Sequence, residues 1–453
     1  MRAQFALCPG HPATIRMLVW TESCTRPFTR CIPDDVPFMT TLPNTPEDLA
    51  PHAAWKKNLY VCLFGSFTTI LAMTLILPIL PVYIQNLGVT DPQAVVSWSG
   101  WIFSITFLAA GIMAPLWGRF ADRYGRKLIL IRASLGMAIG IALIGCAQTV
   151  WQLFWLRLLV GLLGGYASGA TILVATQTPR EHTGWAVGVL ASGTLAGNLL
   201  GPLVGGIVPA LLGIRLTFFV AAGFILIAFF CTAFMISETH KPRKPAQKNE
   251  TTYSFWRSGA QRNLVLLMLL AGTLLMFANM SVEPIITLYL ASLHTLTDQI
   301  PLLAGIAMSA TAFGSMLFSS RAGRWGDRHG HLKMLMASFV ATAVLLLLQG
   351  FAQTDWQFIA LRFLMGMTLC GIMPALTAMI RHNVPADTAG GVLGYATSTQ
   401  YAGLVLGPLA GGWVANQAGF TAVFVMTGMV MLVAAALLLR QMSKTAEPDA
   451  TRS

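Results

Sequence analysis

Long apolar runs, separated by short polar stretches, make up most of this chain after residue 56. Each run approaches the roughly 20 residues that a helix needs to cross the hydrocarbon core of a bilayer. The pattern predicts about twelve membrane helices. The expected spans are residues 59–84, 98–117, 128–148, 151–177, 184–209, 214–236, 263–290, 300–320, 332–352, 356–380, 389–416 and 419–440.

The composition supports a membrane protein. Hydrophobic residues make up 55% of the chain and charged residues only 10%, whereas a soluble domain has roughly 25% charged residues. The mean hydropathy is +0.66. The net charge of +12 does not indicate nucleic-acid binding, because the basic residues are spread over short loops rather than gathered into one patch.

The distribution of Lys and Arg predicts that both termini are cytoplasmic, because these residues accumulate in cytoplasmic loops. Under that orientation Arg215 is the only basic residue in the outer loops. We expect a multi-pass membrane protein. The predicted parts are a disordered tail at 1–56, six-helix bundles at 57–236 and 263–440, a cytoplasmic linker at 237–262, and a tail at 441–453.

The first residues of the chain have a different character from the rest, being rich in Pro, Thr and Arg without helical periodicity. Disorder is the expected state of such a segment. Translation could start naturally at Met39, which opens an ordinary short cytoplasmic leader, or at Met1. In the linker we expect Lys241, Arg243, Lys244 and Lys248 to lie at an anionic lipid surface.

A glycine pattern, G-x8-G-x3-G-P-x2-G-G, occurs once in each half with identical spacing. The first copy is Gly188, Gly197, Gly201, Pro202, Gly205 and Gly206, and the second is Gly394, Gly403, Gly407, Pro408, Gly411 and Gly412. Asp122 and Asp327 are 205 residues apart, as are Arg157 and Arg362. This internal duplication in an apolar chain predicts a transporter whose substrate path lies between two repeats.

Two interpretations of the glycine pattern remain open. Glycines at this spacing let helices approach closely, and a proline permits a bend. The pattern could therefore serve tight packing alone, or it could form a bendable contact between the halves.

A polar motif joins the second and third expected spans. Gly118, Asp122, Arg123, Gly125, Arg126 and Lys127 form G-x3-D-R-x-G-R-[RK], and Gly323 to Lys333 repeat much of it. This motif resembles the loop signature of the major facilitator superfamily. The glycine pattern and the segments WSGWIFSITFLAAGIMAPLWGRFADRYGRKLILIRASLGMAIG and LPILPVYIQNLGV are similar to its drug:proton antiporter branch.

The resemblance implies an all-helical fold of twelve membrane helices in two pseudo-symmetric six-helix bundles, located in the bacterial inner membrane. It also implies that Asp122 holds a cytoplasmic gate closed in the outward-open state. An anion can rest against the positive end of a neighbouring helix, and a helix starting near residue 389 is the expected partner. The alternative is a solvated turn in which Arg123 and Arg126 only follow the positive-inside bias.

Two buried charges are candidates for proton coupling. Arg157, with Gly161, matches a family signature associated with coupling, although the repeat copy Arg362 allows a shared architectural role. Glu283 is the only carboxylate well inside a predicted span. An intramembrane carboxylate is expensive and is usually functional; a neutral acid bonded to a neighbouring helix, beside a break at Pro284, is the alternative.

Other polar residues in the spans are candidates for lining a substrate cavity, or for helix-packing hydrogen bonds. They are Asn198, Asn279, Tyr395, Gln400 and Tyr401. Pro78 and Pro81 predict a bend in the first span. Several related antiporters carry an acid in that span, whereas this chain has TTILAMTLILPILP there, which weakens an assignment to cationic drugs.

The seven cysteines lack metal-ligand spacing, and no Gly-Lys pair exists to form a phosphate-binding loop. We therefore expect no metal site, no cofactor and no enzyme activity. The predicted function is proton-driven export of varied drugs or amphiphiles by a monomer that contacts protons, membrane lipid and small molecules. The alternatives are a uniporter or importer of a metabolite, and a receptor or scaffold that transports nothing.

Overall fold

A computed structural model describes residues 46–179, 181–238, 262–293 and 299–446, together with β1 (Ala6–Leu7) and β2 (Ile15–Arg16). The chain divides into two units, Met1–Ala50 and Pro51–Ser453. In the first unit β1 and β2 pair antiparallel. The expected start at Met39, most of the tail expected to be disordered, and the linker cations Lys241, Arg243, Lys244 and Lys248 lie outside the described residues.

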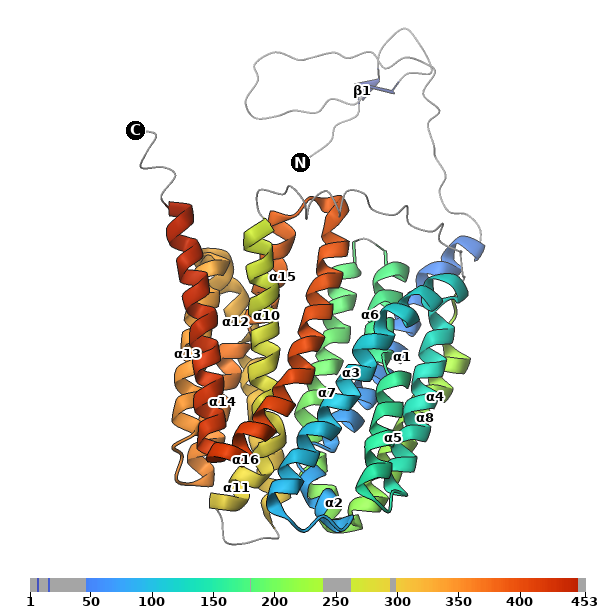
Figure 1. Cartoon of the computed structure of the whole chain (residues 1–453). Helices are drawn as coiled ribbons and strands as arrows, with labels where there is room; N and C mark the ends of the chain where they lie inside the picture. The colour runs from blue at the N-terminus through green and yellow to red at the C-terminus, as the bar shows by residue number, and fades with distance from the viewer. Residues whose placement is uncertain are drawn as a thin grey trace. The chain divides into compact units, whose positions relative to one another are not determined.

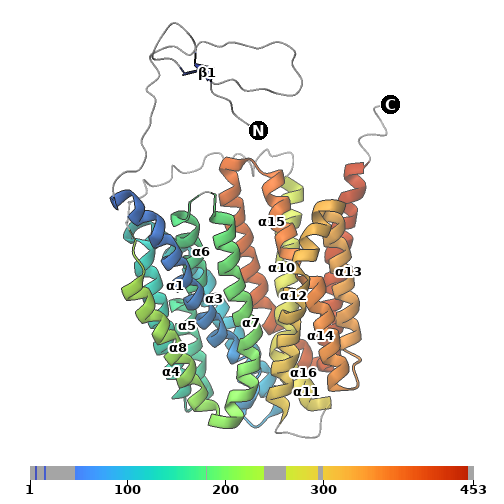
Figure 2. The same cartoon turned by 180° about the vertical axis from the view of Figure 1, so that it is seen from behind.

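The second unit is helical throughout its described part (Figures 1 and 2). The first half contains α1 (Pro46–Leu75), α2 (Leu80–Asn86), α3 (Pro92–Tyr124), α4 (Arg126–Gly145), α5 (Val150–Leu163), α6 (Tyr166–Gln177), α7 (Thr183–Leu212) and α8 (Ile214–Met235). The second half contains α10 (Arg262–Val282), η1 (Glu283–Ile285), α11 (Ile286–Leu293), α12 (Ile300–His329), α13 (His331–Gln349), α14 (Asp355–Leu369), α15 (Ile372–Asn383) and α16 (Ala386–Ala446).

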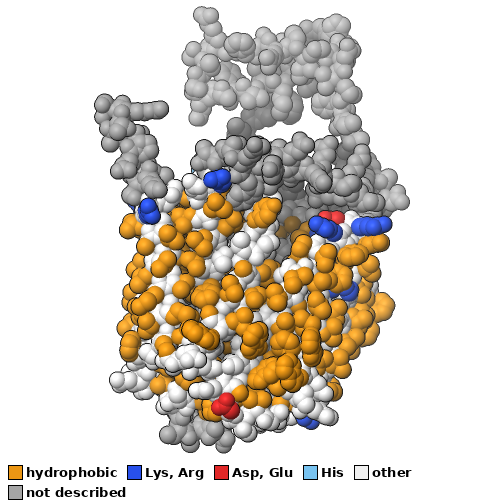
Figure 3. All heavy atoms as spheres, viewed as in Figure 1, with side chains coloured by type: hydrophobic (Ala, Val, Ile, Leu, Met, Phe, Trp, Pro, Cys, Tyr) orange, Lys and Arg blue, Asp and Glu red, His pale blue; other side chains and the backbone are white. Residues whose placement is uncertain are grey.

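These elements confirm the predicted twelve membrane helices. Eleven helical stretches in the described residues are long and apolar enough to cross a bilayer. The longest of them contains two spans, because α16 changes direction at Gly419, whose φ is 81°. The outer surface fits a membrane protein. Figure 3 shows that hydrophobic side chains cover one side of the unit and that most of the visible Lys and Arg side chains lie near its upper end.

Four of the twelve spans are broken, and the breaks occupy equivalent positions in the two halves. The first and seventh spans break between α1 and α2 and at η1, and the fourth and tenth break between α5 and α6 and between α14 and α15. A break frees backbone groups that lipid cannot satisfy. In the fourth span, Arg132 donates to the carbonyl of Gly164 (3.0 Å) and Trp117 donates to that of Leu162 (2.8 Å).

The duplication extends to individual hydrogen bonds. The hydroxyl of Tyr83 donates to the carbonyl of Ile144 at 2.6 Å, and that of Tyr289 donates to the carbonyl of Gln349 at 2.9 Å. Each tyrosine follows the break in its span, so it ties the short outer piece, α2 or α11, to a helix of the same half.

The helical bundle has two ends, the linker face and the opposite face. The linker face holds the turns at Gly125 and Gly330, between α3 and α4 and between α12 and α13; it is uppermost in Figure 1. The opposite face holds α2 and α11.

The halves touch through two equivalent helix pairs, α3 with α16 and α12 with α7. The hydroxyl of Ser104 on α3 donates to the carbonyl of Val405 on α16 at 2.7 Å. Its repeat copy, Ser309 on α12, donates to the carbonyl of Leu199 on α7, also at 2.7 Å. A pseudo-twofold relation therefore governs the interface as well as each half.

Glycines bring these helix pairs into backbone contact toward the opposite face. A methyl group on Gly100 would lie 2.6 Å from the carbonyl oxygen of Pro408, and one on Gly305 would meet the carbonyl oxygen of Pro202. Glycines nearer the linker face behave differently. At Gly118, Gly188, Gly323 and Gly394 a methyl group would have nothing described within 4 Å. The halves are thus closed together toward the opposite face and apart toward the linker face.

Replacing Gly100 by Ala should destabilise the closed interface, because the added methyl meets a backbone oxygen that cannot turn away. Overpacking of this kind costs typically about 1–3 kcal/mol. Thermal unfolding of the purified protein in detergent measures the effect. Gly118→Ala on the same helix is the control: it enters open space and should leave the midpoint unchanged or raised. Equal midpoints for the two variants would contradict the described contact.

Candidate functional site

A buried ion pair lies where the seventh span breaks. Nη1 of Arg362, on α14, lies 3.4 Å from Oε1 of Glu283, the first residue of η1. Arg362 is 0% exposed and Glu283 is 8% exposed. The guanidinium also lies over the ring of Phe358, 5.5 Å from its centroid. Glu283 is therefore held between a cation and a helix break, inside the second half.

Several polar atoms around this pair have no partner among the described residues. Nε and Nη2 of Arg362 and Oδ1 of Asn279 are buried and unpaired. Asn279 and Arg362 line the same small cavity, whose volume is about 10 Å³. That volume is about what the centre of one water molecule requires, and the three atoms supply donors and an acceptor for it.

Arg157 occupies the equivalent position in the first half but has different surroundings. It is 4% exposed, and its Nε and Nη2 have no hydrogen-bond partner among the described residues. The offset of 205 residues that relates Arg157 to Arg362 relates Pro78 to Glu283. The first half thus keeps the arginine and lacks the acid, and the two predicted coupling residues, Glu283 and Arg157, belong to different halves.

The motif between α3 and α4 forms an exposed turn on the linker face. Gly125 has a φ of 96°, in the region that favours glycine. Asp122, with a side chain 58% exposed, accepts from Nη2 of Arg126 at 3.0 Å. Glu238, which follows the last helix of the first half, caps the first turn of α4. Its carboxylate accepts from the backbone N–H groups of Arg126 and Lys127 at 3.0 and 2.6 Å.

The second copy of this motif uses a different partner. Asp327 lies 3.9 Å from Nε2 of His331, which stands where the first copy has Arg126. Gly330 has a φ of 92°, so the turn is preserved. The helix expected near residue 389 begins at Ala386, as α16, and with the halves apart at this face Asp122 is paired within its own turn.

The glycine pattern faces two neighbours at once. Methyl groups on Gly197, Gly201 and Gly205 of α7 would meet α1 in the same half, whereas Gly206 meets the carbonyl of Pro301 on α12, 2.7 Å from the added methyl. The second copy on α16 repeats this: Gly403, Gly407 and Gly411 face α10, and Gly412 faces Val96 on α3. Packing within a half and contact between halves are therefore built from the same helix.

The predicted lining residues are spread over several helices. Tyr401 on α16 packs on α3, where a methyl group on Gly111 would lie 3.1 Å from its Cβ. The amide of Gln400 lies beside Gly272 on α10. Asn279 lies in the second half beside Arg362, Asn198 is half-buried on α7, and Tyr395 is exposed near the start of α16.

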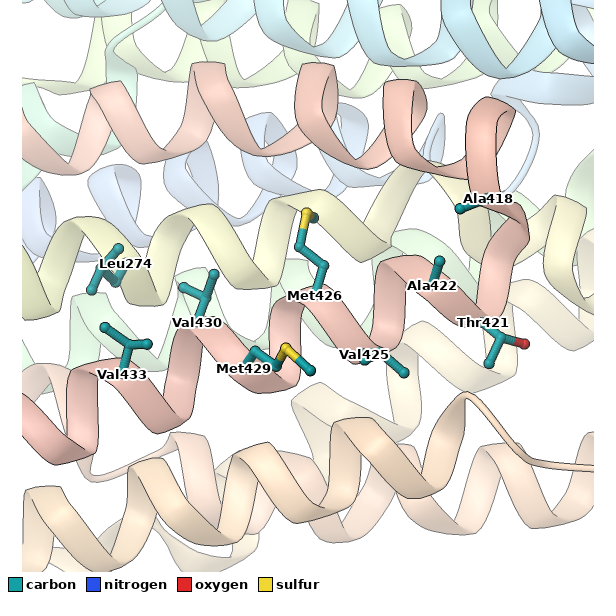
Figure 4. Close-up of a pocket in the computed structure, with 9 residues that line it drawn as sticks. All are labelled: Leu274, Ala418, Thr421, Ala422, Val425, Met426, Met429, Val430 and Val433. Atoms are coloured by element: carbon teal, nitrogen blue, oxygen red, sulfur yellow. The ribbon is translucent and has the colours of Figure 1, made fainter.

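A separate apolar groove lies between α10 and the second span of α16 (Figure 4). Its volume is about 730 Å³. The lining residues are Leu274, Ala418, Thr421, Ala422, Val425, Met426, Met429, Val430 and Val433. None of the residues predicted to bind substrate or protons lines it, and Met429 and Val433 open to the outside of the bundle.

A family model described as Major Facilitator Superfamily matches residues 62–301 and 269–453. The chain belongs to the major facilitator superfamily. It is 40% identical over 399 residues to the multidrug resistance protein MdtG of Enterobacter lignolyticus (strain SCF1), covering 87% of this chain and 95% of that protein. It is 38% identical over 380 residues to MdtG of Proteus mirabilis (strain HI4320), covering 83% and 94%.

Solved structures of the superfamily share the fold. A peptide transporter, POT, in complex with alafosfalin, has a TM-score of 0.70 at 14% identity, covering 86% of this chain and 94% of that chain. The nucleoside transporter NupG has a TM-score of 0.66 at 16% identity, covering 84% and 99%. The superfamily and the MdtG relatives make this protein a membrane transporter rather than an enzyme, similar to multidrug resistance proteins.

Sequence reasoning identified Glu283 but gave its partner too little weight. The sequence held a signal for Arg362: both halves carry the arginine, and only the second carries an acid at the matching break. A break beside Pro284 was predicted only under the alternative in which Glu283 is a neutral acid bonded to a neighbouring helix, and the structure places η1 there.

A double-mutant cycle tests the pair. Arg362→Met strands a buried carboxylate, which typically costs about 3–5 kcal/mol of unfolding free energy. Adding Glu283→Gln removes the stranded charge, so the double variant should be more stable than the sum of the two single changes implies, by about 0.5–3 kcal/mol.

The matched control is Arg157→Met combined with Glu283→Gln, whose effects should add because the two residues belong to different halves. Unfolding by denaturant in mixed micelles provides the free energies. Additive effects for Glu283 and Arg362 would show that the described contact carries no interaction.

Proposed function

We propose that this protein is a proton-coupled exporter of structurally varied drugs and amphiphiles across the bacterial inner membrane. The observation that carries the proposal is the buried pair of Glu283 and Arg362 at a helix break in a chain about 40% identical to multidrug resistance proteins. A charged pair in this position is expensive to maintain in a membrane protein and usually marks an ion pathway.

The linker face is assigned to the cytoplasm. Arg119, Arg123, Arg126 and Lys127 belong to the first turn motif at this face, and Arg321, Arg324, Arg328 and Lys333 belong to the second. Arg215 stands alone near the start of α8, at the opposite face. Positive residues gather on the cytoplasmic side of membrane proteins, so both termini are cytoplasmic and the described conformation is open inward.

Coupling depends on whether the carboxyl group of Glu283 holds a proton or forms the ion pair with Arg362. When its carboxyl group is protonated, the charge that holds Arg362 is lost and the seventh span is released at η1. When the proton leaves, the ion pair reforms between η1 and α14. A water in the cavity beside Asn279 can carry the proton to or from the carboxyl group, and Arg157 supplies a fixed positive charge in the other half.

Alternating access follows from the interface between the halves. The contacts of Gly100 with Pro408 and of Gly305 with Pro202 open as the halves rock, and the linker-face ends of the same helices approach. Asp122 then moves from Arg126 to the start of α16, where the helix end favours an anion, and it holds the cytoplasmic side closed. One chain contains both halves, so a monomer suffices.

Replacing Glu283 by Gln should abolish coupling without removing the fold. Efflux of a hydrophobic fluorescent dye, driven by a pH gradient in inverted vesicles, should fall by roughly 5- to 150-fold, the usual range for loss of a coupling free energy. Glu181→Gln, an exposed carboxylate on the linker face, is the control and should retain efflux. Undiminished, uncoupler-sensitive efflux by the Glu283 variant would defeat the proposal.

Labelling tests the orientation. In a variant without native cysteines, Tyr124→Cys should react with a membrane-impermeant maleimide only in inverted vesicles, and Arg215→Cys only in intact spheroplasts. Both positions are exposed in the structure, so burial of the introduced cysteine would not explain a failure to react. The reverse pattern would place the linker face outside the cell.

A further inference from the structure

An aromatic pocket lies at the opposite face, between α3 and α5. Its volume is about 510 Å³, and it is lined by Ala94, Ser97, Trp98, Trp101, Trp151 and Phe154. The rings of Trp98 and Trp151 meet edge to face, with centroids 4.8 Å apart, and Phe154 packs on both. The volume falls in the range of small-ligand sites, roughly 300–1,000 Å³.

A carboxylate stands beside this pocket. Asp91 caps α3, and its Oδ2 accepts from the backbone N–H of Ala94, a lining residue, at 3.0 Å. The side chain is exposed, so its charge is available to a ligand. Aromatic faces attract organic cations, and quaternary or primary ammonium groups are commonly bound in this way. Rings and carboxylate together favour a cation of that class.

The internal duplication shows that packing does not require these rings. The residues 205 positions later than Trp98, Trp101 and Phe154 are Leu303, Ile306 and Ile359, so only Trp151 has an aromatic copy, Trp356. Tryptophan is enriched at membrane interfaces in general. That tendency explains separate exposed tryptophans such as Trp155 and Trp413, and it does not explain four rings that line one pocket.

The position of the pocket identifies the source of the cation. Ala94 to Trp101 occupy the first turns of α3, which begins at Pro92, so they lie within about 15 Å of the helix end at 1.5 Å per residue. Trp101 and Trp151 are 54% and 58% exposed in the wall of the bundle. The pocket therefore lies at the depth of a lipid headgroup and its first methylenes, and it opens toward the surrounding lipid.

We propose that this pocket binds the primary ammonium headgroup of a zwitterionic membrane phospholipid, with the ammonium over the ring of Trp98 on the side of the Asp91 carboxylate and the first methylenes against Trp101. The site adjoins the interface between the halves, because Asn416 on α16 donates to Oγ of Ser97 (2.7 Å) and to the carbonyl of Gln93 (3.0 Å). A bound lipid therefore supports the closed state of this face. The proposal does not depend on the direction or coupling of transport.

Native mass spectrometry of the full chain tests this site. Detergent-solubilised protein is titrated with dioleoyl phosphatidylethanolamine or, separately, dioleoyl phosphatidylglycerol. The double variant Trp98→Leu/Trp101→Leu should weaken binding of the ethanolamine lipid by roughly 5- to 30-fold, the size of a desolvated cation–π contact. Asp91→Asn should also weaken it, and it keeps the helix cap because Asn caps as well as Asp.

The repeat provides the matched control, since Trp356→Leu removes the exposed copy in the other half and should leave binding of both lipids unchanged. Binding of the glycerol lipid should be the same in every variant. Equal ethanolamine-lipid binding by wild type and the two pocket variants would overturn the proposal. So would an equal loss in Trp356→Leu, or a parallel loss of the glycerol lipid, because either result would describe a general aromatic belt.

Discussion

Close backbone contact at glycine is the constraint on which the rest of this structure depends. Two helices of each half must pack against their own bundle and against the other half at the same time, and only residues without a side chain allow both approaches. On α7, Gly201 lies against α1 of the same half and Gly206 lies against α12 of the other half. On α16, Gly407 lies against α10 and Gly412 against α3 in the same way. Because the two interfaces are copies, opening one without the other would break the pseudo-twofold relation, so the halves are expected to move as rigid bodies.

The two halves share their helical arrangement but differ in their buried charges. Both halves keep a buried arginine, a broken first helix and a tyrosine that ties the broken piece down, yet only the second half places an acid at its break. An architectural arginine explains the copies, and Glu283 makes one of them part of a buried ion pair. The aromatic pocket is a second departure from the repeat, confined to the first half.

Much of this could be predicted from the sequence, for identifiable reasons. Apolar run length fixes the spans, because lipid leaves a helix few alternatives, and the glycine spacing indicates the contact helices. The breaks at Gly164 and Gly371 could not be predicted; the carbonyl at Gly164 is satisfied by Arg132, a residue distant in the sequence. The extra turns of α3 and α12 beyond the apolar run, and the pairing of Glu283 with Arg362 rather than Arg157, likewise depend on tertiary contacts.

Distances between spin labels on the two faces test the central claim, that the halves approach at one face of the bundle as they separate at the other. One pair, Tyr124→Cys and Tyr395→Cys, reports on the linker-face ends of α3 and α16; the other, Thr90→Cys and Trp413→Cys, reports on the opposite face. Across a pH titration in nanodiscs, the account predicts that the first distance shortens whenever the second lengthens. Two distances that stay constant, or that change in the same direction, would contradict it.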